Sequence, residues 1–249
     1  MKTPFTLITI LLTATLLAGC VSINLNPAAK NIILSDNIIS ESRSVSGFTG
    51  VDMRTVGTIT INQGATESLV VKGSDNLLPL VKTSIQNGTL VIEMENVNIQ
   101  SLKKDNLLAF EITVKNLNSL NVSGLGTVDM SGLETKSLNL AMSGAGSIKI
   151  EKLAADSVSV NVSGLGGIIL AGKARRAEIE ISGAGEVNAA DLECETAKTS
   201  LSGIGTATVW VTDALTGNIS DAGSVRYFGE PQANTNSTGV GRFKALGNK

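Results

Sequence analysis

Apolar residues alternate with polar ones on both sides of a recurring Ser-Gly-X-Gly tetrapeptide. Five intact copies begin 20, 20, 19 and 20 residues apart, at Ser123, Ser143, Ser163, Ser182 and Ser202. In the first four copies, the positions one and three residues before the serine and five and seven residues after it are all apolar. A period of two is typical of strands that bury one face. Each repeat is therefore predicted to hold two short strands.

Two glycines flank one variable residue in every copy of the motif. A chain that turns a corner between two strands has little room for a Cβ at such positions. A strand pattern follows each glycine pair, whereas a phosphate-binding loop needs a following helix. We therefore interpret the motif as a structural corner. Its residues are Ser123, Gly124, Gly126, Ser143, Gly144, Gly146, Ser163, Gly164, Gly166, Ser182, Gly183, Gly185, Ser202, Gly203 and Gly205.

A repeat of about 20 residues without a helical pattern predicts an all-β fold, a right-handed parallel β-helix-like solenoid. Its coils would stack about 4.8 Å apart around a column of aliphatic side chains. The first coil is expected to include residues 56–61, and weaker copies of the motif extend the series to 241. The 20-residue period is absent between residues 62 and 116. There the Asn87-Gly88 turn predicts a small antiparallel excursion that caps one end.

The N-terminus combines a lysine, a short apolar stretch and a cysteine that follows small residues. Lys2 precedes the apolar residues 5–17, which are few for a membrane span and predict a secretory signal peptide. The end of this segment resembles the cleavage site of bacterial lipoproteins. The resemblance implies signal-peptidase recognition of Leu17, Ala18 and Gly19, and lipidation, including palmitate, at Cys20.

Lipidation at Cys20 would anchor the chain to a membrane of the cell envelope. Val21 follows the cysteine, in place of the acidic residue that retains enterobacterial lipoproteins at the inner membrane, so an outer-membrane location is expected. The predicted division of the chain is a signal peptide at 1–19, a lipidated N-terminus and tether at 20–46, and a solenoid domain at 47–230 that includes the excursion at 62–116. Residues 231–249 are expected to form a C-terminal coil or tail.

The composition removes several classes of function. The 249 residues include no histidine, which excludes imidazole acid–base chemistry and the commonest zinc ligand. The acidic residues form no ladder in the repeat, so no catalytic residue, metal ligand or cofactor is predicted. The formal charge is −2, and no basic patch with interleaved aromatic residues indicates nucleic-acid binding. Cys194 shares its phase with Ala155 and Ala174 and is expected to face the core.

Three segments that precede the motif series carry a family resemblance. They are "SRSVSGFTGVDMRTVGTITINQG" at 42–64, "ESLVVKGSDNLLPLV" at 67–81 and "NGTLVIEM" at 87–94. Together with the repeated glycine corners they resemble the bacterial GIN domain of auto-transporter adhesin heads, over residues 42–228. The resemblance implies a β-helix-like fold and a cell-envelope location, often as a lipoprotein.

The residue between the two glycines forms an apolar row of Leu125, Ala145, Leu165, Ala184 and Ile204. An exposed row would be a contact surface, but a continuous aliphatic stripe in water is uncommon, which favours burial under a terminal segment. The sequence thus predicts a non-enzymatic envelope lipoprotein that binds a glycan or protein partner through its solenoid. Two alternatives stay open: a structural lipoprotein that associates with its own copies and, less favoured, a carbohydrate-active enzyme.

Overall fold

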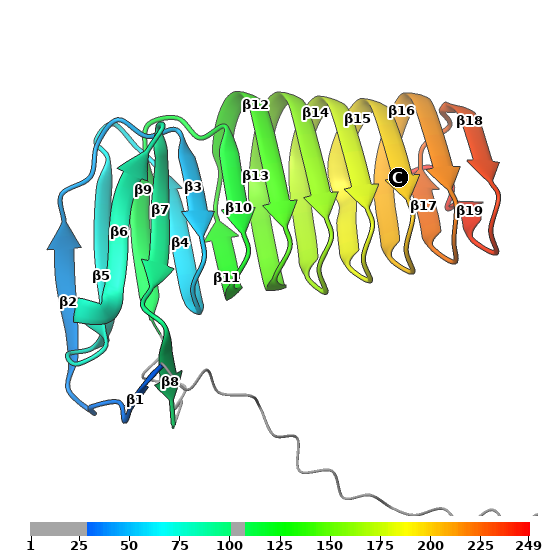
Figure 1. The fold of residues 1–249 in the computed structure, drawn as a ribbon. Helices are drawn as coiled ribbons and strands as arrows, with labels where there is room; N and C mark the ends of the chain where they lie inside the picture. Colours follow the sequence, from blue (N-terminus) through cyan, green and yellow to red (C-terminus); the bar gives the residue numbers. More distant parts are fainter. Residues whose placement is uncertain (1–28, 101–107) are drawn as a thin grey trace, which may run out of the picture.

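The computed structural model describes residues 29–100 and 108–249. These residues form an elongated β-solenoid of about six turns with roughly 20 residues per coil (Figure 1). The described residues contain no α-helix, and their one helical element is the 3-10 turn η1 (Leu78–Leu80). The predicted all-β solenoid is confirmed.

Each coil contributes two strand segments, and both lie parallel to the equivalent segments of neighbouring coils. The early coils keep the segments separate, as β3 (Gly50–Met53) with β4 (Gly57–Gln63) and β10 (Ser119–Val122) with β11 (Leu125–Met130). The later coils run through longer, bent strands. These are β12 (Leu133–Met142), β13 (Ala145–Val162), β14 (Gly167–Ile181), β15 (Glu186–Leu201) and β16 (Thr206–Ile219).

The core is a set of apolar columns that run along the solenoid axis. The parallel register places Val128 beside Ile148 and Ile148 beside Ile168, and all three are fully buried. The positions one and three residues before each motif serine are buried in the first four copies, as are those five and seven residues after it. The phase predicted from the alternation is therefore confirmed, since side chains alternate between the two faces of a strand.

Antiparallel strands close the N-terminal end, as predicted. β6 (Val81–Gln86) pairs antiparallel with β7 (Thr89–Met94), and β5 (Ser68–Ser74) pairs antiparallel with β9 (Ala109–Val114). β7 and β9 in turn lie parallel to β3 and β4. These two strands therefore already belong to a solenoid layer, and β5 and β6 cover its outer edges.

Residues predicted to be a tether also enter the fold. β2 (Ile38–Arg43) pairs antiparallel with β5, while β1 (Lys30–Ile32) and β8 (Val97–Ile99) form a separate two-stranded parallel sheet. The Arg43 guanidinium donates hydrogen bonds of 2.7 and 3.0 Å to the carbonyl oxygens of Val81 and Leu78. Arg43 thereby fastens β2 to η1 and β6.

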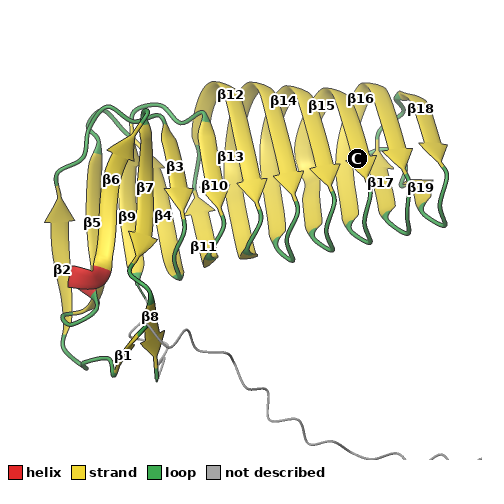
Figure 2. Cartoon of the chain, viewed as in Figure 1, coloured by secondary structure: helices red, strands yellow, loops and turns green. Residues whose placement is uncertain are grey.

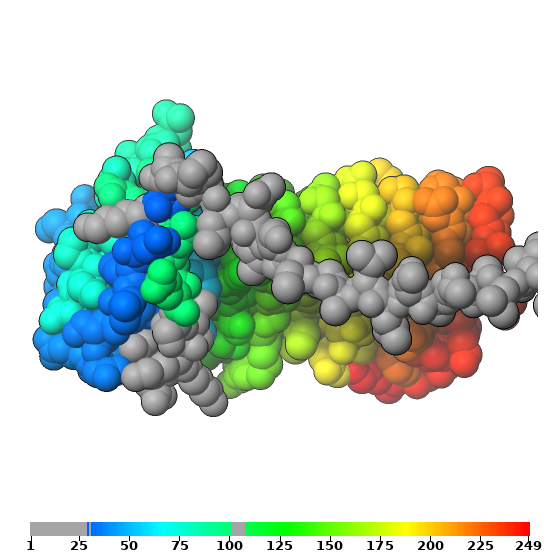
Figure 3. All heavy atoms as spheres, turned by 60° about the horizontal axis from the view of Figure 1, so that its bottom comes forward, coloured from blue at the N-terminus to red at the C-terminus, as the bar shows by residue number. Residues whose placement is uncertain are grey.

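The C-terminal residues continue the solenoid. β18 (Gln232–Ser237) lies parallel to β16, and β19 (Arg242–Ala245) lies parallel to β17 (Ser224–Phe228). In β18 the residues in register with the buried Leu215 and Ile219 are Ala233 and Ser237. The apolar column thus ends in small and polar side chains, and Figure 3 shows this last coil at the end of the molecule opposite the N-terminal cap.

The Ser-Gly-X-Gly motifs form loops along the lower edge of the solenoid in Figure 2. A Cβ at Gly144 would overlap the carbonyl oxygen of Gly124 in the preceding coil, and the same holds for Gly164 against Gly144. The second glycine of a motif is equally crowded: a Cβ at Gly146 would overlap the carbonyl oxygen of Gly126, and one at Gly166 would meet the Met142 side chain. These close approaches leave room for glycine alone at the corner.

In the described part of the chain, no helix is both long enough and apolar enough to cross a bilayer.

Candidate functional site

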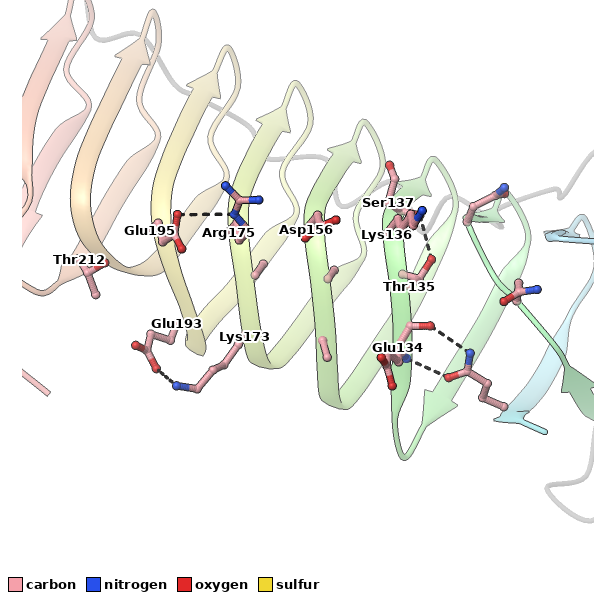
Figure 4. A pocket seen from close by; sticks show the side chains of 16 residues that line it. Glu134, Thr135, Lys136, Ser137, Asp156, Lys173, Arg175, Glu193, Glu195 and Thr212 are labelled. Atoms are coloured by element: carbon pink, nitrogen blue, oxygen red, sulfur yellow. Dashed lines mark hydrogen bonds and ion pairs between the residues drawn. The ribbon is translucent and has the colours of Figure 1, made fainter. Parts of the chain in front are cut away.

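A groove with a volume of about 1100 Å³ crosses the coils where β12 to β15 bend. Its bottom is formed by Ala154, Ala155 and Ala174, and the amides of Asn116 and Asn118 line one end. Charged side chains surround it on all of these strands, as Figure 4 shows. They are Glu134, Lys136, Asp156, Lys173, Arg175, Glu193 and Glu195.

A column of small inward-facing residues explains the hollow. Thr135, Ala155, Ala174 and Cys194 stand beside one another in successive coils. Two positions earlier the residues are leucines in three of these coils, at Leu133, Leu153 and Leu192, and glycine in the fourth, at Gly172. Small side chains at this column fill less space than the neighbouring leucines, and the groove lies over the same strands at this position.

The outward charges follow the same register and alternate in sign. Lys136, Asp156, Arg175 and Glu195 occupy one position of four successive coils, each directly after a residue of the small column. Arg175 Nε lies 3.8 Å from Glu195 Oε2, and Lys173 Nζ lies 2.8 Å from Glu193 Oε2. The groove therefore presents cations and anions in adjacent coils, with no excess of either charge among these residues.

Gln63 closes the end of the groove nearest the N-terminal cap. Its side-chain amide donates to the carbonyl oxygens of Lys115 and Glu134, at 3.1 and 3.0 Å, and its Oε1 accepts a 2.9 Å bond from the Glu134 amide. This bidentate contact to Glu134 ties β4 to the start of β12. The wall at this end is therefore held by hydrogen bonds between the Gln63 side chain and the backbone.

Cys194 lies beneath the groove and faces the core, as its phase predicted. It is 1% exposed, and its Sγ donates to the Leu192 carbonyl oxygen at 3.6 Å. Burial, with a smaller contribution from the Glu193 carboxylate, raises the pKa of the Cys194 thiol to about 12.

We therefore expect Cys194 to be inert in the folded protein. At pH 8 a thiol with a pKa of about 12 is ionised in about one molecule in ten thousand, and the thiolate is the reactive form. Labelling of the Cys20→Ser protein, in which Cys194 is the one remaining cysteine, with iodoacetamide at pH 8 should be undetectable in buffer and complete in denaturant. Fast labelling of the folded protein would contradict the buried position.

The structure places the predicted corner residues at the lower edge in Figure 2, half a coil away from the groove. The Ser123 hydroxyl donates to the Met53 carbonyl oxygen at 3.4 Å, so this serine is engaged with the backbone. Leu125, Leu165 and Ile204 are exposed, and the expectation that the apolar row is buried is wrong. Leu17, Ala18, Gly19 and Cys20 lie outside the described residues.

The groove was not predicted from the sequence, although two signals for it are present in the repeat. One is the small column that contains Cys194, and the other is the alternation of charge that follows it. Among the described residues, no group of three or more Cys, Asp and Glu side chains could hold a metal ion. The charged and amide side chains that line the groove can form hydrogen bonds and charge pairs with a ligand.

Comparison with protein families identifies the fold. The family model described as "Putative auto-transporter adhesin, head GIN domain" matches residues 47–231. The chain belongs to this family. No curated protein matches it.

Solved structures agree with the GIN-domain assignment. A "putative adhesin" from Bacteroides fragilis is 27% identical, with a TM-score of 0.82 over 86% of this chain and 100% of that chain. A "putative adhesin" from Parabacteroides merdae is 20% identical, with a TM-score of 0.69 over 88% of this chain and all of its own. A "putative lipid binding protein" from Parabacteroides distasonis is 21% identical, with a TM-score of 0.68 over 87% and 100%. The last two share the fold with this chain.

Proposed function

We propose that this GIN-domain chain is a non-enzymatic, lipid-anchored protein of the cell envelope, which captures a glycan in the mixed-charge groove. The observation that carries the proposal is the composition of the groove around its alanine floor. A hydroxyl-rich ligand needs hydrogen-bond donors and acceptors close together. The groove supplies donors in Lys136 and Arg175, acceptors in Asp156 and Glu193, and amides that do both in Asn116 and Asn118.

The ion pairs in the groove leave it open to a ligand. Arg175 and Glu195 are both solvent-exposed, with their closest charged atoms 3.8 Å apart. Exposed pairs of this kind contribute little to stability, so a ligand can replace one partner at small cost. A hydrogen bond from a ligand hydroxyl to either charged group is stronger than one between neutral groups.

Carboxylates beside a groove are also the feature that would favour the carbohydrate-active alternative. Here Glu193 pairs with Lys173 and Glu195 lies beside Arg175. Glycoside hydrolysis needs two facing carboxyl groups, of which one protonates the leaving group. Glu193 and Glu195 lie two residues apart on β15 and each lies beside a cation of the preceding coil, so they do not form such a facing couple. This arrangement supports a binding role, in agreement with the adhesin description of the family.

The experiment is a glycan array probed with the full chain that carries Cys20→Ser, which keeps it free of lipid. We expect a retained glycan whose affinity falls at least tenfold in the double variant Lys136→Ala/Arg175→Ala, since both donors on one wall are lost. The matched control is Lys149→Ala. Lys149 is an exposed lysine outside the groove whose Nζ lies 2.6 Å from Glu151 Oε1.

The two variants separate ligand contacts from general effects of charge. Surface substitutions usually change the free energy of unfolding by less than about 0.5 kcal/mol, so all three proteins should melt together. An array without any retained glycan would contradict the proposal. Equal affinities of the double variant and the wild type would place the ligand elsewhere.

A further inference from the structure

The residues between the corner glycines form one exposed row, here called the corner row. It consists of Leu125, Ala145, Leu165, Ala184, Ile204, Ala222 and Val240, which the parallel register stacks in successive coils. In the coil of Ala222, Asp221 takes the place of the first glycine. Eight large hydrophobic residues are exposed in the described part of the chain. Four of them lie in this row, with exposed fractions of 64% for Leu125, 75% for Leu165, 69% for Ile204 and 80% for Val240. Single exposed leucines are ordinary, but four at one repeat position form a continuous feature.

Large and small side chains alternate along the corner row. From Leu125 onward, every leucine, isoleucine or valine is followed in the next coil by an alanine. Coils stack about 4.8 Å apart, so the large side chains stand roughly 9.6 Å apart with a notch at each alanine between them. The row therefore alternates between protruding large side chains, here called knobs, and small depressions at the alanines, here called holes.

The surface around the corner row loses little when it leaves water. Residues 121–127, 141–147, 161–167 and 200–206 contain no charged side chain, whereas the coil of Ala184 carries Glu180 and Glu186 and the coil of Ala222 carries Asp221. The corner backbone is already hydrogen-bonded from coil to coil, as Ala145 N is to Gly124 O at 3.2 Å and Leu165 N to Gly144 O at 3.2 Å. Burying a polar group without a hydrogen-bond partner costs free energy. Because these backbone groups already have partners, covering the corners with another surface would leave few of them unpaired.

We propose that the corner row is the interface between two copies of this chain, related by a two-fold axis so that the rows run antiparallel. With the axis between the coils of Leu165 and Ala184, Leu165 faces Ala184 of the second copy, Ile204 faces Ala145 and Leu125 faces Ala222. Moving the axis one coil onward places Ile204 opposite Ala184, Leu165 opposite Ala222 and Val240 opposite Ala145, and leaves Leu125 beyond the end of the facing row. A parallel, in-register contact would place large residues against each other. A parallel contact offset by one coil would also oppose large residues and alanines, but it is not two-fold symmetric and does not close as a dimer. Among closed pairs the alternation therefore selects the antiparallel one.

The surface proposed for the dimer is independent of the groove. The corner row lies half a coil away from the groove, so both grooves of a dimer remain open to ligand. A specific protein interface typically buries about 800 Å² of surface on each partner, and a single row of side chains buries less than that. We therefore expect the dimer to be weak in dilute solution. Two open grooves on one particle would bind a repeating glycan more tightly than one groove does.

The test is sedimentation equilibrium of the full chain with Cys20→Ser over a wide range of concentration. We expect a monomer–dimer equilibrium that is weakened at least tenfold by Leu165→Ser, which removes a knob. Ala184→Leu should weaken it comparably, because it fills the hole that faces a large residue in either register. Ala184→Ser keeps the size of the side chain and should leave the dimer unchanged.

The Ala184→Leu variant distinguishes the proposal from non-specific adhesion. This change adds apolar surface, so a merely sticky row would associate more tightly, and that outcome overturns the knob-and-hole dimer. Binding of the wild type to phosphatidylcholine vesicles, strengthened by Ala184→Leu while the protein in solution stays monomeric, would overturn it in favour of a lipid surface. A wild type that is monomeric at every concentration and does not bind vesicles also overturns it. The groove variant Lys136→Ala/Arg175→Ala should dimerise as the wild type does, so failure of the glycan proposal leaves this result unaffected.

Discussion

Gly144→Val is expected to destabilise the solenoid by about 3 kcal/mol or more, because the new side chain would overlap backbone. The Cβ would meet the carbonyl oxygen of Gly124, which accepts the hydrogen bond from Ala145 N in the next coil. A clash with a flexible side chain can relax by rotation, but here two coils must separate. Such a change is a large part of the roughly 5–15 kcal/mol that stabilises a typical domain. Urea unfolding followed by circular dichroism measures it.

Ala145→Val is the matched control, since it adds the same side chain one residue further along the corner. Ala145 belongs to the outward corner row, and its neighbours in that row, Leu125 and Leu165, are large and exposed. We expect a change of no more than about 0.5 kcal/mol in the free energy of unfolding. If the two variants unfold at the same urea concentration, the corner glycines are not fold determinants.

The sequence predicts the solenoid core well because two periods reinforce each other. The alternation of two places Val128 and Met130 on one face, and the spacing of about 20 residues stacks Val128 on Ile148. Both are local regularities, and each is satisfied only if successive coils lie in parallel register. Few alternative folds bury the same residues, so the core and its phase follow from the sequence alone.

The exposure of the corner row could not be derived in the same way. Alternation assigns a face only while the backbone remains an extended strand. Gly124 and Gly126 interrupt the strand on either side of Leu125, and so the parity counted from Val122 no longer tells where Leu125 points. The structure settles the orientation through the close approach of Gly124 to the backbone of the preceding coil at Thr55.

The N-terminal cap depends on partners distant in sequence. β2 is an edge strand whose central residues are all exposed, so the segment "IISESR" lacks the alternation by which the other strands were recognised. Its place is decided by antiparallel pairing with β5, about 30 residues onward, and by the Arg43 contacts to Val81 and Leu78. The composition of this segment alone predicts a tether, and only its pairing with β5 shows that it is a strand.

Cys20→Ser is expected to move the chain from the membrane fraction to the soluble fraction. The proposed anchor requires the Cys20 thiol for acylation, and serine supplies none. Stable anchoring of a lipidated protein depends on the buried acyl chains, each CH₂ contributing about 0.8 kcal/mol. Losing them should reduce membrane retention to near zero. Fractionation by sedimentation measures membrane retention, and incorporation of labelled palmitate measures acylation.

Cys194→Ala is the matched control for the anchor, because it removes the other cysteine of the chain. The Cys194 thiol is buried with its pKa raised to about 12, and alanine already fills the equivalent position in the preceding coil at Ala174. The control should therefore fold, take up palmitate and sediment with membranes as the wild type does. If Cys20→Ser still sediments with membranes but takes up no palmitate, the acyl chains are not the anchor and an apolar protein surface must hold the chain there. The corner row would then be the first surface to test, by adding Leu165→Ser and Ile204→Ser to Cys20→Ser.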